Sequence, residues 1–163
     1  NCTYSNPNLG LGQNSFNLKY ELAALVYGKT SLKKNEAITI MDGPFVSVYP
    51  AYEGRHTLSS VIYTPFKKYA DYELFSSDYK KRVDLAQKED VGAKIIEEVK
   101  KYLQIDTECE KIWVTGKTKL ASDKGDSREV LVNKNKKVIS VLGGKLDAVY
   151  EAKRKILEYI YEI

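Results

Sequence analysis

The chain has 163 residues, of which 43% are hydrophobic, and this length suits one domain or one large lobe of a larger protein. Its 26 basic and 22 acidic residues are mixed along the sequence without a basic arm, so the net charge of +4 weakly favours anionic ligands and argues against nucleic acid as a partner. The sequence has no run of about 18 apolar residues, no signal-peptide pattern and no lipidation motif, so we expect a cytoplasmic protein with no membrane partner.

The first half of the sequence predicts a strand followed by a three-stranded antiparallel meander. Residues 18–27 follow a loop rich in Asn, Gly and Ser; their pattern fits a strand or a helix, and we favour the strand. The meander consists of three β-prone runs that are separated by Gly43-Pro44 and by Glu53-Gly54-Arg55. These runs cover residues 37–42, 45–50 and 57–63.

The second run of the meander alternates in character. Phe45, Ser47 and Tyr49 share one face of the predicted strand, whereas Val46 and Val48 share the other. An antiparallel sheet can pack one face against a core and leave the other face more polar. We therefore expect the polar face of this sheet to be a usable wall for a ligand.

The second half predicts two principal helices and three further strands. Val91, Ile95 and Val99 repeat at helical spacing, so we expect a helix over residues 90–103 with Asp90 as its cap. Strands are expected over residues 111–120, 129–133 and 138–142, whereas residues 65–87 lack firm periodicity and are interpreted as a long connection. The final helix is expected to place these residues on its inner side: Leu146, Val149, Ile156, Leu157 and Ile160.

These elements predict an α+β fold, with an antiparallel-rich sheet and two principal helices in a single lobe over residues 1–163. The sequence lacks a G-x-G-x-x-G after a strand, a P-loop and a G-x-S-x-G elbow, so a complete hydrolase or kinase is not expected. Cys2 and Cys109 have no ligand-like spacing, so we expect reduced thiols and no metal site.

A glycine pair, Gly143-Gly144, lies between the strand-like run 138–142 and the helix that begins at Lys145. A turn without side chains at the start of a helix exposes backbone N–H groups near the positive end of the helix dipole. Such a turn favours an anion or an electron-rich ring. The alternative is that the pair forms a tight strand-to-helix turn and nothing more.

Three segments of the sequence carry a family resemblance. Ile-Met-Asp-Gly-Pro-Phe-Val-Ser-Val-Tyr-Pro at 40–50, Gly-Arg-His-Thr-Leu at 54–58 and Val-Ile-Tyr-Thr-Pro at 61–65 resemble the substrate-lobe sheet of FAD-dependent oxidoreductases of the D-amino-acid oxidase superfamily. Residues 1–5 are similar to the strand that leaves the flavin-binding domain of this family, and residues 138–152 resemble the strand, turn and helix that return to the flavin. The resemblance covers about the C-terminal half of a family member.

The resemblance implies a larger protein whose N-terminal half binds FAD, and in which the flavin accepts a hydride from an amine or amino-acid-like substrate. It also implies cofactor contacts at both ends of this chain, made by Asn1 and Thr3 and by Gly143, Gly144 and Lys145. The family's dinucleotide-binding motif would lie in the other half, so we do not expect this chain alone to hold FAD tightly or to be active.

Five residues are candidates for substrate binding. Members of the family use an arginine to bind a substrate carboxylate, and the region that supplies it aligns loosely with residues 115–118. Lys117 stands there in place of the arginine, and Arg128 is the other candidate. The alternative for each is a solvated surface residue. His56 is a candidate for proton transfer or a surface histidine beside a turn. Tyr49 and Tyr63 end adjacent predicted strands, where they would form a hydroxyl-lined wall or a cross-strand aromatic pair.

Two classes of function follow from the sequence. The first is the substrate-binding part of an FAD-dependent oxidoreductase, with Tyr49, His56 and Tyr63 as the polar groups nearest to the substrate. The second is a flavin-free ligand-binding or interaction module that retains the sheet.

Overall fold

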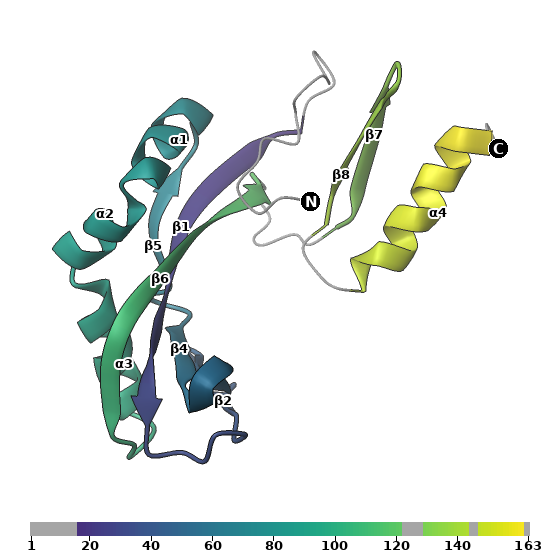
Figure 1. Cartoon of the computed structure of the whole chain (residues 1–163). Coiled ribbons are helices and arrows are strands. Elements are labelled where there is room, and N and C mark those ends of the chain that lie inside the picture. Colours follow the sequence, from purple (N-terminus) through teal and green to yellow (C-terminus); the bar gives the residue numbers. More distant parts are fainter. Residues whose placement is uncertain (1–15, 122–128, 144–146, 162–163) are drawn as a thin grey trace.

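The computed structural model describes residues 16–121, 129–143 and 147–161 (Figure 1). In chain order the elements are β1 (Leu18–Thr30), β2 (Ile38–Ile40), β3 (Val46–Pro50), the 3-10 turn η2 (Tyr52–Gly54), β4 (His56–Ser60), β5 (Pro65–Tyr69), α1 (Tyr72–Lys80), α2 (Arg82–Lys88), α3 (Val91–Lys100), β6 (Thr107–Leu120), β7 (Leu131–Asn135), β8 (Val138–Leu142) and α4 (Ala148–Tyr161). The predicted α+β fold is confirmed. Among the described residues, the two predicted helices are the two longest of four.

The main sheet has six antiparallel strands and is organised around β1. This strand of 13 residues pairs along its whole length with β6 on one side. On its other side, β1 pairs with β5 near its N-terminal end and with β4 near its C-terminal end, so the strand order is β2-β3-β4-β1-β5 with β6 beside β1. The two long strands β1 and β6 therefore form the spine to which the shorter strands attach (Figure 1).

The predicted meander corresponds to β2, β3 and β4, which pair in sequence. Gly43 lies in the first turn with φ of 82°, a backbone conformation that glycine adopts without steric cost. The third strand is shorter than expected, because β4 ends at Ser60 and Tyr63 lies in the turn that follows. Local alternation and turn residues were therefore enough to specify the three strands, but not the end of the last one.

Helices α1, α2 and α3 cover one face of the main sheet (Figure 1). The core between them contains, among others, Val26 of β1, Val48 of β3, Leu58 of β4 and Ile95 of α3, none of which is exposed. Each such side chain contributes roughly 1.5–3 kcal/mol by its removal from water. A second cluster, around Tyr20 and Phe75, joins β1 to α1 through stacked rings whose centroids are 5.1 Å apart.

The interpretation of residues 65–87 as a long connection is wrong. This segment contains β5, α1 and α2. Helix α1 begins where the carboxylate of Asp71 accepts a hydrogen bond from the backbone N–H of Leu74, and it is anchored by the buried ring of Phe75. Its weak sequence signal has a physical reason, because only this ring among the nine residues of the helix is fully buried.

The predicted helix over residues 90–103 is confirmed as α3, which is three residues shorter at its C-terminal end. Asp90 occupies the N-cap position, but its backbone is left-handed, with φ of 52°, and its side chain makes no capping hydrogen bond. Burial of Val91, Ile95 and Val99 against the sheet therefore stabilises this helix, and the expected cap does not.

The last part of the described chain is the β7–β8 hairpin with α4 packed beside it. Lys155 donates to the carbonyl oxygen of Val130 at 2.7 Å, and Lys134 donates to that of Tyr159 at 2.9 Å. Figure 1 shows this unit on the side of the main sheet away from α1–α3. The predicted inner face of α4 is partly wrong, because Val149 and Ile160 are exposed; Leu146 lies outside the described residues.

Candidate ligand-binding face

The face of the main sheet opposite α1–α3 is the candidate ligand-binding surface, and we call it the helix-free face. Directly paired residues of an antiparallel sheet share a face, and alternate residues along a strand change face. Val26, Val48 and Leu58 pack toward the helices, so their neighbours along each strand point the other way. By this register the helix-free face carries Thr39, Ser47, Tyr49, Thr57 and Ser59 from the meander, Glu21 and Tyr27 from β1, and Lys111, Trp113, Thr115, Lys117 and Lys119 from β6.

A three-ring aromatic cluster lies at one end of this face. The rings of Tyr27 and Trp113 stack with centroids 4.6 Å apart, and Tyr52 of η2 packs against both, at 5.0 Å from Tyr27 and 5.6 Å from Trp113. Tyr27 is buried, whereas Tyr52 is 52% exposed. Such ring pairs contribute about 0.5–1.5 kcal/mol beyond area burial, so the cluster fixes η2 against the sheet.

The environment of Tyr27 keeps its phenol protonated. Burial, the nearby Tyr52 and the carboxylate of Glu53 raise the pKa of Tyr27 to about 12, and Arg55 opposes them. The hydroxyl of Tyr27 donates to the carbonyl oxygen of Tyr52 at 3.3 Å. The raised pKa means that this hydroxyl stays protonated, as a hydrogen-bond donor, at alkaline pH values where an ordinary tyrosine begins to ionise.

A row of hydroxyl groups crosses the meander on the same face. The hydroxyls of Thr39 and Tyr49 are 2.8 Å apart, and Thr39 Oγ1 donates to Ser47 Oγ at 3.3 Å. Tyr49 is 50% exposed, and its strand partner is Thr57. These side chains present several hydrogen-bonding groups to whatever lies against the meander, which agrees with the predicted polar wall.

The other end of the helix-free face is rich in lysine. Glu21 of β1 is 4% exposed and forms an ion pair with Lys119 of β6, with Oε2 and Nζ 3.0 Å apart. Glu21 is paired directly with Lys117 on β6 and with Lys68 on β5, and both of these lysines are exposed. Lys117, a predicted substrate residue, therefore does lie on the polar face of the sheet.

The structure does not bring Tyr49, His56 and Tyr63 together, and the prediction that they share one site is corrected. His56 is paired with Gly28, has no exposed surface, and lies on the face that packs toward the helices. Its Nδ1 is 2.9 Å from Thr30 Oγ1, and its Nε2 has no hydrogen-bond partner in the described part of the chain. The interpretation of His56 as a surface histidine beside a turn is therefore wrong.

Tyr63 is also on the core side. It packs against the cluster formed by the meander and α3, and it lies in a turn, so it cannot pair with Tyr49 across two strands. The reason for both errors is the same. The face that a residue at a strand end occupies depends on the register with β1, and this register is not a local property of the sequence.

Five predicted site residues lie outside the described residues: Asn1, Thr3, Arg128, Gly144 and Lys145. Gly143 is described, and it has a packing role. A Cβ at this position would lie 3.1 Å from Cβ of Ala148 in α4. The lack of a side chain therefore lets the chain turn closely against the start of the last helix.

A polar hollow of about 420 Å³ lies where β1 ends and β6 begins, beside the C-terminal end of α3. Its lining includes Lys29, Thr30, Lys100 and Thr107, and the hydroxyl of Thr107 is buried without a partner in the described chain. Sequence reasoning did not find this hollow, because its residues come from three separate segments. It is open to solvent.

The described residues offer neither a metal site nor a membrane-spanning helix. No group of three or more His, Cys, Asp or Glu side chains there is arranged to hold a metal ion. No helix within residues 16–121, 129–143 and 147–161 is long and apolar enough to cross a membrane. Cys109, which the structure describes, is a free and exposed cysteine.

Comparison of the chain with protein-family models, with curated proteins and with solved structures found no match. The function of the chain is therefore inferred from the helix-free face itself. Sequence reasoning missed four contributors to it, namely Tyr27, Tyr52, Lys111 and Trp113. The alternation of Lys111, Trp113, Thr115 and Lys117 was the available signal, since residues two apart share one face of a strand.

Proposed function

We propose that this chain is the substrate-binding part of an FAD-dependent oxidoreductase of the D-amino-acid oxidase superfamily, which oxidises an amine or amino-acid-like substrate by hydride transfer to the flavin. The observation that carries the proposal is the contrast between the two faces of the main sheet. One face is covered by α1–α3, whereas the other presents hydroxyl, aromatic and ammonium groups over five strands. A sheet of this kind is suited to cover a planar cofactor with a substrate held between.

The residues that resemble the family support this proposal by their positions. The segment 40–50 spans the end of β2, the Gly43 turn and β3, and its alternation places Ser47 and Tyr49 on the helix-free face. The second part of the resemblance, residues 138–152, spans β8, the glycine turn and the start of α4. Both segments thus fall on elements that lie on, or beside, the polar side of the sheet.

The residues of the chain fit a role in substrate binding better than a role in holding the cofactor. When bound, FAD would supply the hydride acceptor. The hydroxyls of Ser47, Tyr49 and Thr57 would orient a polar substrate, and the Tyr27–Tyr52–Trp113 cluster would exclude water at one end of the wall. Among the described residues, no buried acid or base faces this wall unpaired, because Glu21 is paired with Lys119.

The test uses the full-length protein, purified and examined for bound FAD and for loss of the visible flavin absorbance when amines or amino acids are added without oxygen. A blocking substitution, Ser47→Arg, should slow flavin reduction about tenfold or more, because misplacement of a substrate by a small distance is costly. Ser77→Arg, the same substitution on an exposed position of α1, should leave reduction unchanged. A full-length protein without FAD, or equal rates for the two variants, would contradict the proposal and favour a flavin-free module.

A further inference from the structure

Lys111 is held on the helix-free face by the aromatic cluster. Its Nζ lies 4.6 Å from the ring centroid of Tyr27 and 5.5 Å from those of Tyr52 and Trp113. It also donates a hydrogen bond to the hydroxyl of Tyr52 at 3.0 Å. Three rings and one hydroxyl thus restrict a side chain that normally has large rotamer freedom, so the ammonium group occupies a fixed place on an exposed surface.

The ammonium of Lys111 differs from other cations near it. Arg55 forms an ion pair with Glu110 at 2.7 Å, and Lys29 pairs with Glu108 at 3.2 Å. In the described part of the chain, Lys111 has no carboxylate within ion-pair distance, and its only side-chain hydrogen bond goes to Tyr52. An ammonium group has three N–H donors, and a ring face attracts a cation without neutralising its charge.

We propose that Lys111, held by Tyr27, Tyr52 and Trp113, is the anchor for an anionic oxygen group of the ligand that binds to the helix-free face. The group is a carboxylate or a phosphate, since both present charged oxygens to an ammonium donor. Two N–H donors of Lys111 are available for it. The inference rests on the proposed function in one respect, because the proposed function identifies this ligand as the substrate. The anion site itself is a property of this chain and does not need the flavin.

The position of Lys111 also specifies where the ligand would extend. In the sheet register, Lys111 is opposite Tyr27, and Tyr27 is opposite Thr57 on the next strand. Thr57 is in turn opposite Tyr49, whose hydroxyl forms a hydrogen bond with the hydroxyl of Thr39. A ligand anchored at Lys111 would therefore lie along a row of hydroxyl groups that leads across the meander. The substrate class is an amine that carries a carboxylate or phosphate at the Lys111 end and further polar groups along this row.

The test is a titration of the 163-residue chain with succinate and, in a second arm, with inorganic phosphate, at constant ionic strength. Binding is followed by amide chemical shifts and by the emission of Trp113, the single tryptophan of the chain. We expect shifts that saturate and that cluster around Lys111, Thr57 and Thr115. Lys111→Met should weaken binding about tenfold or more, since a hydrogen bond to a charged group is lost, while Lys111→Arg should retain most of it.

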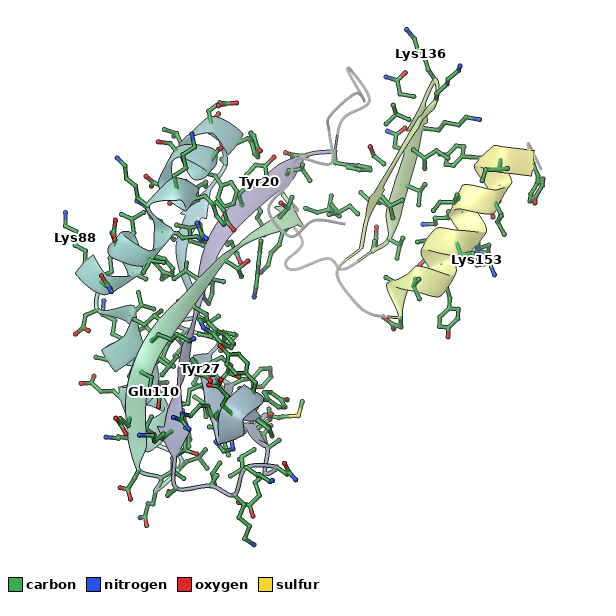
Figure 2. All side chains as sticks on the ribbon, in the orientation of Figure 1. Tyr20, Tyr27, Lys88, Glu110, Lys136 and Lys153 are labelled. Carbon is green, nitrogen blue, oxygen red and sulfur yellow. The ribbon has the colours of Figure 1, made fainter. Side chains whose placement is uncertain are left out.

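The matched control is Lys88→Met, the same substitution on the helix-covered side. Figure 2 shows Lys88 well away from Tyr27 of the aromatic cluster. This variant should bind like the unsubstituted chain. Neutral succinamide, used in place of succinate, should cause no saturable shift. Any of three results would overturn the inference: equal binding by Lys111→Met and Lys88→Met, no saturable binding of either anion, or an equal response to succinamide. None of these results would affect the flavin test of the full-length protein.

Discussion

Substitution of Gly28 by alanine should strongly destabilise the fold, because Gly28 lies at the irregularity where the β1–β6 register shifts. An added Cβ would lie 1.9 Å from the carbonyl oxygen of Glu108 and 2.9 Å from its carbonyl carbon. These atoms belong to the backbone of the neighbouring strand, so rotation of a side chain cannot relieve the clash. The two strands must move apart at the point where Gly28 is also paired with His56 of β4.

The size of the effect follows from the hydrogen bonds at risk. Separation of the strands beyond Gly28 would weaken about two or three backbone hydrogen bonds of roughly 1 kcal/mol each, so we expect a loss of about 2–3 kcal/mol in the free energy of unfolding. In urea this corresponds to a midpoint lower by about 1–1.5 M, for a slope of about 2 kcal/mol per M. The assay is equilibrium unfolding followed by the emission of Trp113, whose strand is directly affected.

Gly92→Ala is the matched control for this experiment. Its Cβ would lie 2.9 Å from Cδ1 of Ile112, which is the mobile end of a side chain. A gain of about 1 kcal/mol in helix propensity within α3 would offset the repacking, so the net change should stay within about 1 kcal/mol. A Gly28→Ala protein with the stability of the unsubstituted chain, or one no less stable than Gly92→Ala, would refute the reasoning about the spine of the sheet.

Two further predictions concern titratable groups. Hydrogen bonds from Lys67 and Tyr69, each 2.8 Å from Oδ2 of Asp78, hold the pKa of this carboxyl below its ordinary value of 3.8. Asp78→Asn should therefore lower the free energy of unfolding by about 1 kcal/mol at neutral pH. The difference in stability between the variant and the unsubstituted chain should shrink as the pH falls through the folded-state pKa of Asp78. Urea unfolding that gives the same difference from neutral to acidic pH would contradict this. Partial desolvation raises the pKa of the Cys109 thiol, so iodoacetamide should alkylate Cys109 in the folded chain more slowly than free cysteine at neutral pH. The rate is measured by mass spectrometry of the peptide that contains Cys109, and equal rates would contradict the prediction.

The meander was predictable from sequence because its determinants are local. Gly43-Pro44 breaks the chain between two strands, and the alternation of Val46, Ser47 and Val48 specifies which side packs into the core. The helices α1 and α2 were missed because their short, highly charged sequences depend on contacts with the sheet, such as the burial of Phe75 against Tyr20. Local propensity alone does not specify such elements.

The candidate site was only partly predictable, and the reason is again the distance in sequence between its parts. Tyr49 was identified on the polar face, since alternation within one strand is visible in the sequence, whereas Lys117 was proposed only from the family resemblance. The aromatic cluster joins Tyr27, Tyr52 and Trp113 from three different segments, and only the pairing of β1 with β6 brings them together. His56 was misplaced for the same reason, because register with β1 decides its face.

The central claim, that the helix-free face is covered by cofactor and substrate in the full-length protein, is tested most directly by hydroxyl-radical footprinting. Oxidation rates of Tyr49 and Tyr52, which are 50% and 52% exposed in this chain, are compared between the 163-residue chain and the full-length protein. Tyr102, at the end of α3 on the other side of the sheet, is the internal control. We predict that Tyr49 and Tyr52 become protected in the full-length protein while Tyr102 does not. Unchanged rates at Tyr49 and Tyr52, or protection of Tyr102 alone, would contradict the account.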